Sequence, residues 1–126
     1  MGAGAGIGAG LLFTAQNAAT TSTSTAQIAS FLTNVSTTSP ASALTFSTKN
    51  SSAGLTERLR IDAAGNLGVG VTPSAWRSGY KAIETNFGSF STADNATTRL
   101  SLNAYQSSTG WVTRNLGNSL MFELVN

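Results

Sequence analysis

The sequence predicts an all-β protein, and three observations lead to that prediction. Short stretches in which apolar and polar residues alternate recur along the chain, with Gly, Ser and Asn between them. Only 10% of the residues are charged, well below the roughly 25% of an ordinary globular protein. Alanine makes up much of the 40% hydrophobic content, so few large side chains can fill a core. We therefore expect short strands whose apolar faces are buried between chains.

The N-terminal part predicts a small-residue arm followed by strands. Residues 1–10 are almost entirely Gly and Ala, which suits a flexible arm or close packing on a threefold axis. Residues 11–15 predict a first short strand, and the Thr/Ser-rich residues 17–25 predict a surface loop. In residues 26–35 the apolar spacing permits a short helix, whereas the β-branched and Ser/Thr content permits a strand equally well.

The next segment alternates more regularly. Residues 37–42 contain Pro40 and predict a turn. In residues 43–48, Leu44 and Phe46 point to one side and polar residues to the other, as in a half-buried strand. The chain then reaches its most regular segment.

Residues 55–73, LTERLRIDAAGNLGVGVTP, predict two short strands joined by a tight turn. Asp62 can accept a backbone hydrogen bond in the turn, and Gly65 can supply its left-handed residue. The glycines at 68 and 70 leave one face bare, which permits close approach of another backbone or side chain. An isolated pair of strands with so thin a core is not stable in water, so something else must cover it.

After Pro73 the residues become more aromatic. Residues 74–80 predict a loop or a single helical turn, and residues 81–90 predict a strand interrupted by Gly88. Residues 92–97 predict a polar turn. This change in composition divides the chain into a slender region, 1–73, and a more globular β-region, 74–126.

The C-terminal residues predict one further strand and a closing hairpin. Residues 99–105 alternate between apolar and polar side chains, and residues 107–110 predict a turn. Residues 111–114 and 120–125 predict two strands that pair around the turn at 116–119.

The central segment resembles a known family. The run E-R-L-R-I-D-x-x-G-N-L-G-V-G-x-T-P is similar to a repeated segment of tail-fibre and other fibrous virion proteins of tailed bacteriophages, often found upstream of a self-cleaving chaperone domain. Residues 43–50 resemble the strand that commonly precedes it, and Asn103 to Tyr105 with Gly110 and Trp111 resembles a looser pattern of the same fibres. The matching residues of the central motif are Glu57, Arg58, Leu59, Arg60, Ile61, Asp62, Gly65, Asn66, Leu67, Gly68, Val69 and Gly70.

The resemblance implies an intertwined, homotrimeric fibre or connector with a small C-terminal β-region. It also implies synthesis in the host cytoplasm, a place on the virion at the tail or capsid surface, and other virion proteins as partners. Host attachment is implied for the whole fibre and not for this portion in particular, and a host surface glycan is a candidate partner. It favours a strand over a helix at 26–35. No recognisable chaperone segment follows the motif in this sequence, which leaves the nucleation of a trimer open. The residues expected to pack between chains are Leu44, Phe46, Leu59, Ile61, Leu67 and Val69.

Four aromatic residues are candidates for glycan contact. Their ring faces and neighbouring Asn and Ser groups suit stacking on sugars. The competing interpretation, which we favour, is that they pack within the strands or between chains. These residues are Trp76, Tyr80, Tyr105 and Trp111.

Carboxylate pairs raise the alternative of a tailspike glycan hydrolase. Glu57 with Asp62, or Glu84 with Asp94, could in principle supply the acid and the base or nucleophile. No source of a raised pKa is visible in the sequence, and we expect Glu57 and Asp62 to pair with neighbouring arginines instead. We therefore predict no enzyme activity and no catalytic residues.

Composition excludes several other classes. The chain has no Cys and no His, which excludes disulfides, thiolate nucleophiles, Cys/His zinc sites and a Ser-His-Asp triad. The seven Lys and Arg residues are scattered, which argues against nucleic-acid binding. No stretch approaches the roughly 20 apolar residues of a membrane span. We expect no cofactor, no metal and no membrane insertion, and the remaining alternative is a capsid-surface head fibre or decoration protein.

Overall fold

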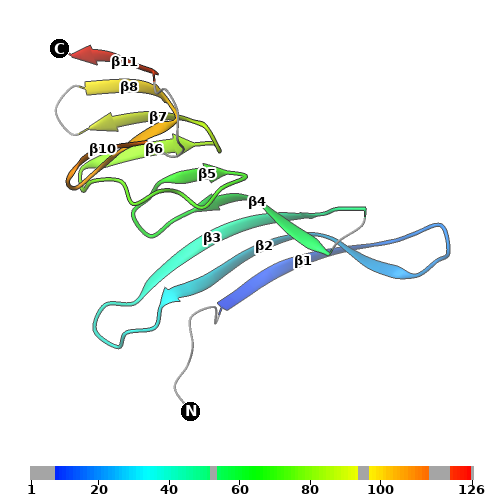
Figure 1. Cartoon of the computed structure of the whole chain (residues 1–126). Helices are drawn as coiled ribbons and strands as arrows, with labels where there is room; N and C mark the ends of the chain where they lie inside the picture. The colour runs from blue at the N-terminus through cyan, green and yellow to red at the C-terminus, as the bar shows by residue number, and fades with distance from the viewer. Residues whose placement is uncertain (1–7, 52–53, 94–96, 114–119, 126) are drawn as a thin grey trace. The chain divides into compact units, whose positions relative to one another are not determined.

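The computed structural model describes residues 8–51, 54–93, 97–113 and 120–125, and these residues are 67% strand with no helix (Figure 1). The predicted all-β class is therefore confirmed. The chain forms two compact units, Met1–Ala63 and Ala64–Asn126. The change of character predicted at Pro73 lies further along the chain than this boundary and stays a prediction.

The first unit is an antiparallel sheet in which each strand pairs with the next along the chain (Figure 1). Its strands are β1 (Gly8–Gln16), β2 (Ser22–Asn34), β3 (Ala41–Lys49) and β4 (Leu55–Ile61). The strands predicted at 11–15 and 43–48 are confirmed, and residues 26–34 lie in a strand rather than a helix. Part of the Gly/Ala arm, residues 1–7, lies outside the described residues.

The loop predicted at 17–25 is shorter than expected, because Ser22 already begins β2. The side-chain oxygen of Asn17 accepts hydrogen bonds from the backbone N–H groups of Ala19 and Thr21, each at 3.0 Å. This Asn-centred turn reverses the chain direction within a few residues, so the rest of the Thr/Ser run belongs to β2.

The second unit contains five strands that are successive neighbours in one sheet, together with a separate hairpin. The sheet strands are β5 (Leu67–Val69), β6 (Tyr80–Glu84), β7 (Gly88–Ala93), β8 (Thr97–Leu102) and β11 (Leu120–Val125), and the hairpin strands are β9 (Ala104–Ser107) and β10 (Gly110–Thr113). Among the sheet strands, β5 and β6 are parallel and the other neighbours are antiparallel, in the order β5-β6-β7-β8-β11.

Two single strands predicted in this unit are wrong, because each is broken by a turn. The segment 81–90 turns back after Glu84, where the N–H of Thr85 donates to the carbonyl of Gly88 at 2.7 Å. The segment 99–105 is interrupted at Asn103, which has a φ of 60° and so leaves the strand conformation.

The predicted closing hairpin of 111–114 with 120–125 is also wrong. β10 pairs with β9, whereas β11 pairs with β8. The turn expected at 116–119 lies outside the described residues, as do residues 94–96 of the polar turn. Both β10 and β11 could pair with more than one antiparallel strand, and the sequence pattern does not indicate which pairing forms.

The strand–turn–strand order predicted for the central motif is confirmed. Gly65 has a φ of 83°, as its place in the turn requires. A Cβ at the buried Gly68 would lie 2.1 Å from the carbonyl oxygen of Val71 and 2.9 Å from Cδ of Pro73. The close approach predicted at this glycine therefore occurs, and it comes from the chain's own following segment.

The interior is thin and unusually polar. Among the residues that the structure describes, the buried hydrophobic side chains are Ala43, Trp76, Ala82 and Ala104. Buried polar residues accompany them: Thr45, Asn66, Glu84, Ser89, Ser91, Ser101 and Gln106. Most large apolar side chains thus lie at the surface, and their arrangement defines the candidate site.

Candidate functional site

A row of large apolar side chains crosses the sheet of the second unit. The strand register places Leu67 opposite Ile83, Ile83 opposite Phe90, Phe90 opposite Leu100, and Leu100 opposite Phe122. Because residues directly opposite each other in neighbouring strands point to the same side, all five lie on one face. We call this row the C-terminal apolar face.

This face is open to solvent. Ile83, Phe90, Leu100 and Phe122 keep between 48% and 59% of their surface exposed. Alternation along β8 and β11 adds Leu102, Leu120 and Leu124 to the same side, each at least 48% exposed. Soluble monomers rarely expose contiguous apolar patches of this kind, and such patches mark sites of interaction.

Two shallow hollows flank Phe90 on this face. One, of about 240 Å³, is lined by Leu67, Ile83 and Phe90 together with Lys81. The other, of about 250 Å³, lies between Ile83, Phe90 and Leu100. Hollows of this size, with a ridge between them, can receive apolar side chains of a facing surface.

The opposite face of the same sheet carries small, polar side chains, and the β9–β10 hairpin contacts it. Ser89 and Ser101 are buried and hydrogen-bonded to each other at 2.7 Å. The hydroxyl of Ser101 also donates to the carbonyl of Ala104 in β9 at 3.1 Å. The side that the chain covers by itself is therefore the polar side, and the apolar side is left open.

A buried carboxylate anchors the segment that precedes β6. Glu84 is 2% exposed and accepts hydrogen bonds from the indole N–H of Trp76 at 2.6 Å, from the hydroxyl of Ser74 at 2.7 Å and from the backbone N–H of Ser74 at 3.1 Å. Three donors directed at one carboxylate offset the cost of burying it. This arrangement is structural, because it uses both carboxylate oxygens to hold the chain.

The four aromatic residues considered as candidates for glycan contact lie in one neighbourhood. The ring of Trp76 stacks on Tyr80 with 6.2 Å between centroids and meets Tyr105 edge-on at 5.8 Å. Trp76 is only 8% exposed, so its ring packs within its own chain. Tyr80 and Tyr105 are half-buried, and Trp111 is 39% exposed.

Arg99 joins two of these rings. Its guanidinium lies 5.5 Å from the ring centroid of Tyr80 and 5.3 Å from that of Trp111. It donates hydrogen bonds to the Tyr80 hydroxyl and to the carboxylate of Glu123, the latter at 2.9 Å. The hydrogen bond to Glu123 raises the pKa of Arg99 above its ordinary value, against the opposing effect of burial. No sequence pattern indicates this grouping, because the residues come from separate strands.

The first unit repeats the pattern of an open apolar row. Leu11 lies opposite Ile28, Ile28 opposite Phe46, and Phe46 opposite Leu59. Leu11 is 59% exposed and Phe46 is 36% exposed. We call this row the N-terminal apolar row.

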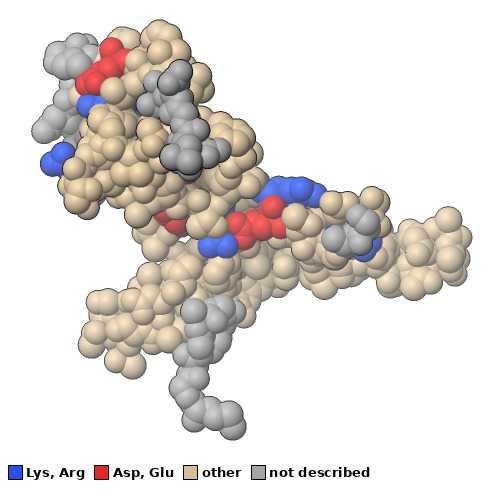
Figure 2. Space-filling model, viewed as in Figure 1, with Lys and Arg blue, Asp and Glu red and all other residues tan. Residues whose placement is uncertain are grey.

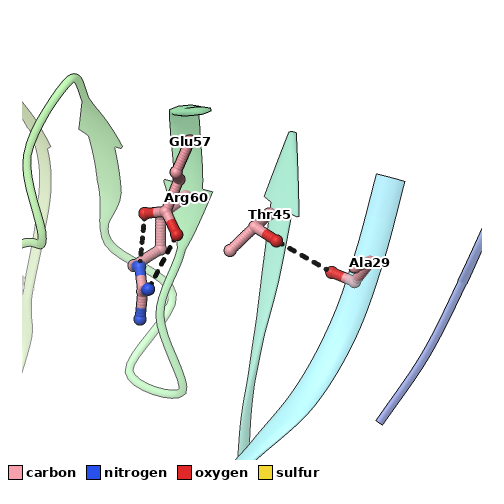
Figure 3. Close-up of polar contacts among 4 residues, drawn as sticks. All are labelled: Ala29, Thr45, Glu57 and Arg60. Atoms are coloured by element: carbon pink, nitrogen blue, oxygen red, sulfur yellow. Dashed lines mark hydrogen bonds and ion pairs between the residues drawn. The ribbon is translucent and has the colours of Figure 1, made fainter. Parts of the chain in front are cut away.

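The other side of this sheet carries a charged pair (Figure 3). Arg60 donates to both carboxylate oxygens of Glu57, at 2.7 and 2.8 Å, and lies 5.0 Å from the ring centroid of Phe31. A β-bulge at Arg58 makes this possible, because residues three apart in a regular strand point to opposite faces and the extra residue restores them to one.

This geometry has two consequences for the predictions. The hydrogen bonds to Glu57 raise the pKa of Arg60 above its ordinary value, and the pairing expected for Glu57 occurs. Arg58 instead donates to the hydroxyl of Thr48 at 3.1 Å, so the two arginines do not share one face as strict alternation would require.

The six residues predicted to pack between chains are not enclosed by their own chain. Leu44, Leu59 and Leu67 are half-buried, whereas Phe46, Ile61 and Val69 are 36%, 38% and 44% exposed. Their contact with other chains stays a prediction. The residues that sequence reasoning did not single out are Ile83, Phe90, Leu100 and Phe122, because their common row depends on strand register.

Charged groups are sparse at the surface, and most of the surface visible in Figure 2 is neutral. Of the two carboxylate pairs considered for hydrolysis, Glu57 is held by Arg60 and Glu84 by Trp76 and Ser74, and Asp94 lies outside the described residues. Within the described ranges, no group of three Asp or Glu side chains is close enough to hold a metal ion. The same residues include no helix able to cross a membrane.

Comparison with protein-family models, with curated proteins and with solved structures finds no match to this chain.

Proposed function

We propose that this chain is a structural, non-enzymatic component of a tailed-bacteriophage virion, a homotrimeric tail fibre or fibre connector that supports adsorption to the host surface. The observation that carries the proposal is the inverted distribution of side chains. Small and polar residues fill the interior of the described chain, and large apolar residues line one side of each sheet.

This distribution favours a chain that becomes stable by association. Ordering each residue costs about 1–2 kcal/mol of backbone conformational entropy, which a folded chain must recover mainly through apolar burial. Three alanines and one tryptophan are a small buried hydrophobic set for the described part of a 126-residue chain. Contact between copies would bury the apolar residues that each copy leaves exposed.

The resemblance of the Glu57–Gly70 segment to phage fibres supports the virion assignment, and the strand–turn–strand structure of that segment agrees with it. In such a fibre the chain would act by shape and rigidity. Receptor sites repeated on three copies would add avidity even when each is weak.

The mass of the native particle tests this proposal. Sedimentation equilibrium or native mass spectrometry of the purified chain should give three times the 12.9 kDa of one copy. A stable monomer at micromolar concentration would contradict the fibre proposal.

Two rival functions are separated by other measurements. Labelling of purified virions for this polypeptide should place it on the tail, whereas label over the head would favour a capsid-surface fibre or decoration protein. Incubation with bacterial surface glycans should release no reducing ends. Release that disappears in Glu57→Gln or Asp62→Asn would instead establish a tailspike hydrolase.

A further inference from the structure

We propose that the C-terminal apolar face is the surface through which copies of this chain associate, with the same face of each copy turned towards the other copies on a common axis. This inference rests on the proposed homotrimer and adds the location of its contact. That contact lies in the second unit, Ala64–Asn126.

The chemistry of the face suits a second copy of itself. Its row of Leu67, Ile83, Phe90, Leu100 and Phe122 contains no ionisable group, so two copies can meet without bringing like charges together. Lys81 lies on the same side, where it lines the hollow beside Phe90, and its amino group donates to the carbonyl of Ala64 at 2.5 Å. A charged partner would find no complementary group in the row.

The extent of the face suits a permanent contact. Two half-exposed phenylalanines alone offer about 200 Å² of surface for burial. The exposed leucines and the isoleucine add several times the area that one such phenylalanine offers. The total approaches the roughly 800 Å² that each partner contributes to a stable interface. Core positions of permanent interfaces are also mostly apolar and depleted in charge, as this row is.

The relief of the face supports the same conclusion. Phe90 stands between hollows of about 240 and 250 Å³. A copy that presents the same ridge can place its Phe90 or Leu100 side chain in such a hollow, so that ridge and hollow are supplied by one sequence. The covered polar side of the sheet, by contrast, is already in contact with the chain's own β9 strand.

A pair of matched substitutions tests the energetic claim. Phe90→Ser should weaken self-association about tenfold or more, because it removes an apolar side chain from the centre of the contact. Phe87→Ser is the control, because Phe87 is 57% exposed and lies in the turn between β6 and β7, outside the row. Sedimentation equilibrium should show normal association for Phe87→Ser, and equal effects of the two changes would overturn the inference.

Cysteine labelling tests the contact directly, since the chain has no native cysteine. In the purified assembled protein, the thiol of Leu100→Cys should react with maleimide at least about tenfold more slowly than that of Ser108→Cys, which lies at the exposed turn between β9 and β10. Mild oxidation of the assembled protein should then form a disulfide between two chains through position 100 but not through position 108.

The outcomes distinguish this inference from the proposed function. A wild-type monomer would contradict the homotrimer itself. A wild-type trimer in which position 100 labels as fast as position 108 would leave the homotrimer standing and reject this face. Protection of position 100 without a link between chains would show that a different surface covers the face, which also rejects the pairing.

Discussion

The indole of Trp76 illustrates how single residues hold this fold together. Its N–H donates to Glu84 at 2.6 Å inside the second unit, and its ring packs between Tyr80 and Tyr105. Sequence reasoning favoured packing for the aromatic residues but gave no partner for Trp76. The partner is a carboxylate eight residues away, on the adjoining strand.

Trp76→Phe should destabilise the protein by about 1–3 kcal/mol, because it leaves one buried carboxylate oxygen of Glu84 with fewer donors. Chemical denaturation followed by circular dichroism measures the change. Trp111→Phe is the control, since Trp111 is 39% exposed and a phenyl ring can still contact Arg99. A larger loss for Trp111→Phe would contradict the assigned role of Trp76.

Arg60→Lys should cost at most about 1 kcal/mol, because the pair with Glu57 is partly exposed and lysine loses only the two-point hydrogen bond and the stacking on Phe31. A double-mutant cycle with Glu57→Gln isolates the pair. Additive effects in the cycle would show that Arg60 acts through Phe31 alone.

At the scale of elements, the second strand of the central motif depends on a glycine that admits the chain's own backbone. Gly68→Ala should destabilise by about 1–3 kcal/mol, because the new Cβ would lie 2.1 Å from the carbonyl oxygen of Val71. Thermal unfolding measures the effect. Gly54→Ala is the control, because its Cβ would meet nothing within 4 Å and its φ is not positive; equal losses would show that glycine flexibility alone matters.

Elements set by local chemistry could be predicted from the sequence, and those set by distant partners could not. Gly65 indicates a turn and the alternation of residues 43–48 indicates a strand, each from local sequence alone, so the turn and β3 could be predicted. Asn103, which ends β8 with a φ of 60°, lies in an unbroken alternating pattern and gave only its residue type as a signal. β10 pairs with β9 and β11 with β8, a choice that is made by packing.

The candidate site was predictable only in part, for the same reason. The apolar positions of β3 and β4 were identified because each strand alternates by itself. The C-terminal apolar face could not be predicted, because Ile83, Phe90 and Leu100 become neighbours only through the register of three strands. The bulge at Arg58, which brings Glu57 and Arg60 to one face, also lacks a signal of its own.

At the scale of the whole molecule, stability should depend on protein concentration. If copies associate through their apolar faces, the thermal midpoint of unfolding should rise as the chain is concentrated over two orders of magnitude, by mass action. Differential scanning fluorimetry at several concentrations measures it. A midpoint that stays constant while the particle mass is that of one chain would contradict association.

The outermost strand β11 has consequences for how the protein must be produced. Its described side chains from Leu120 to Leu124 are all exposed, and among the described strands β8 is the one that pairs with it. An apolar edge of this kind is a template for unwanted strand addition. A newly synthesised copy is therefore prone to aggregate until it associates with other copies. Slow expression at low temperature should yield more soluble protein than rapid overproduction.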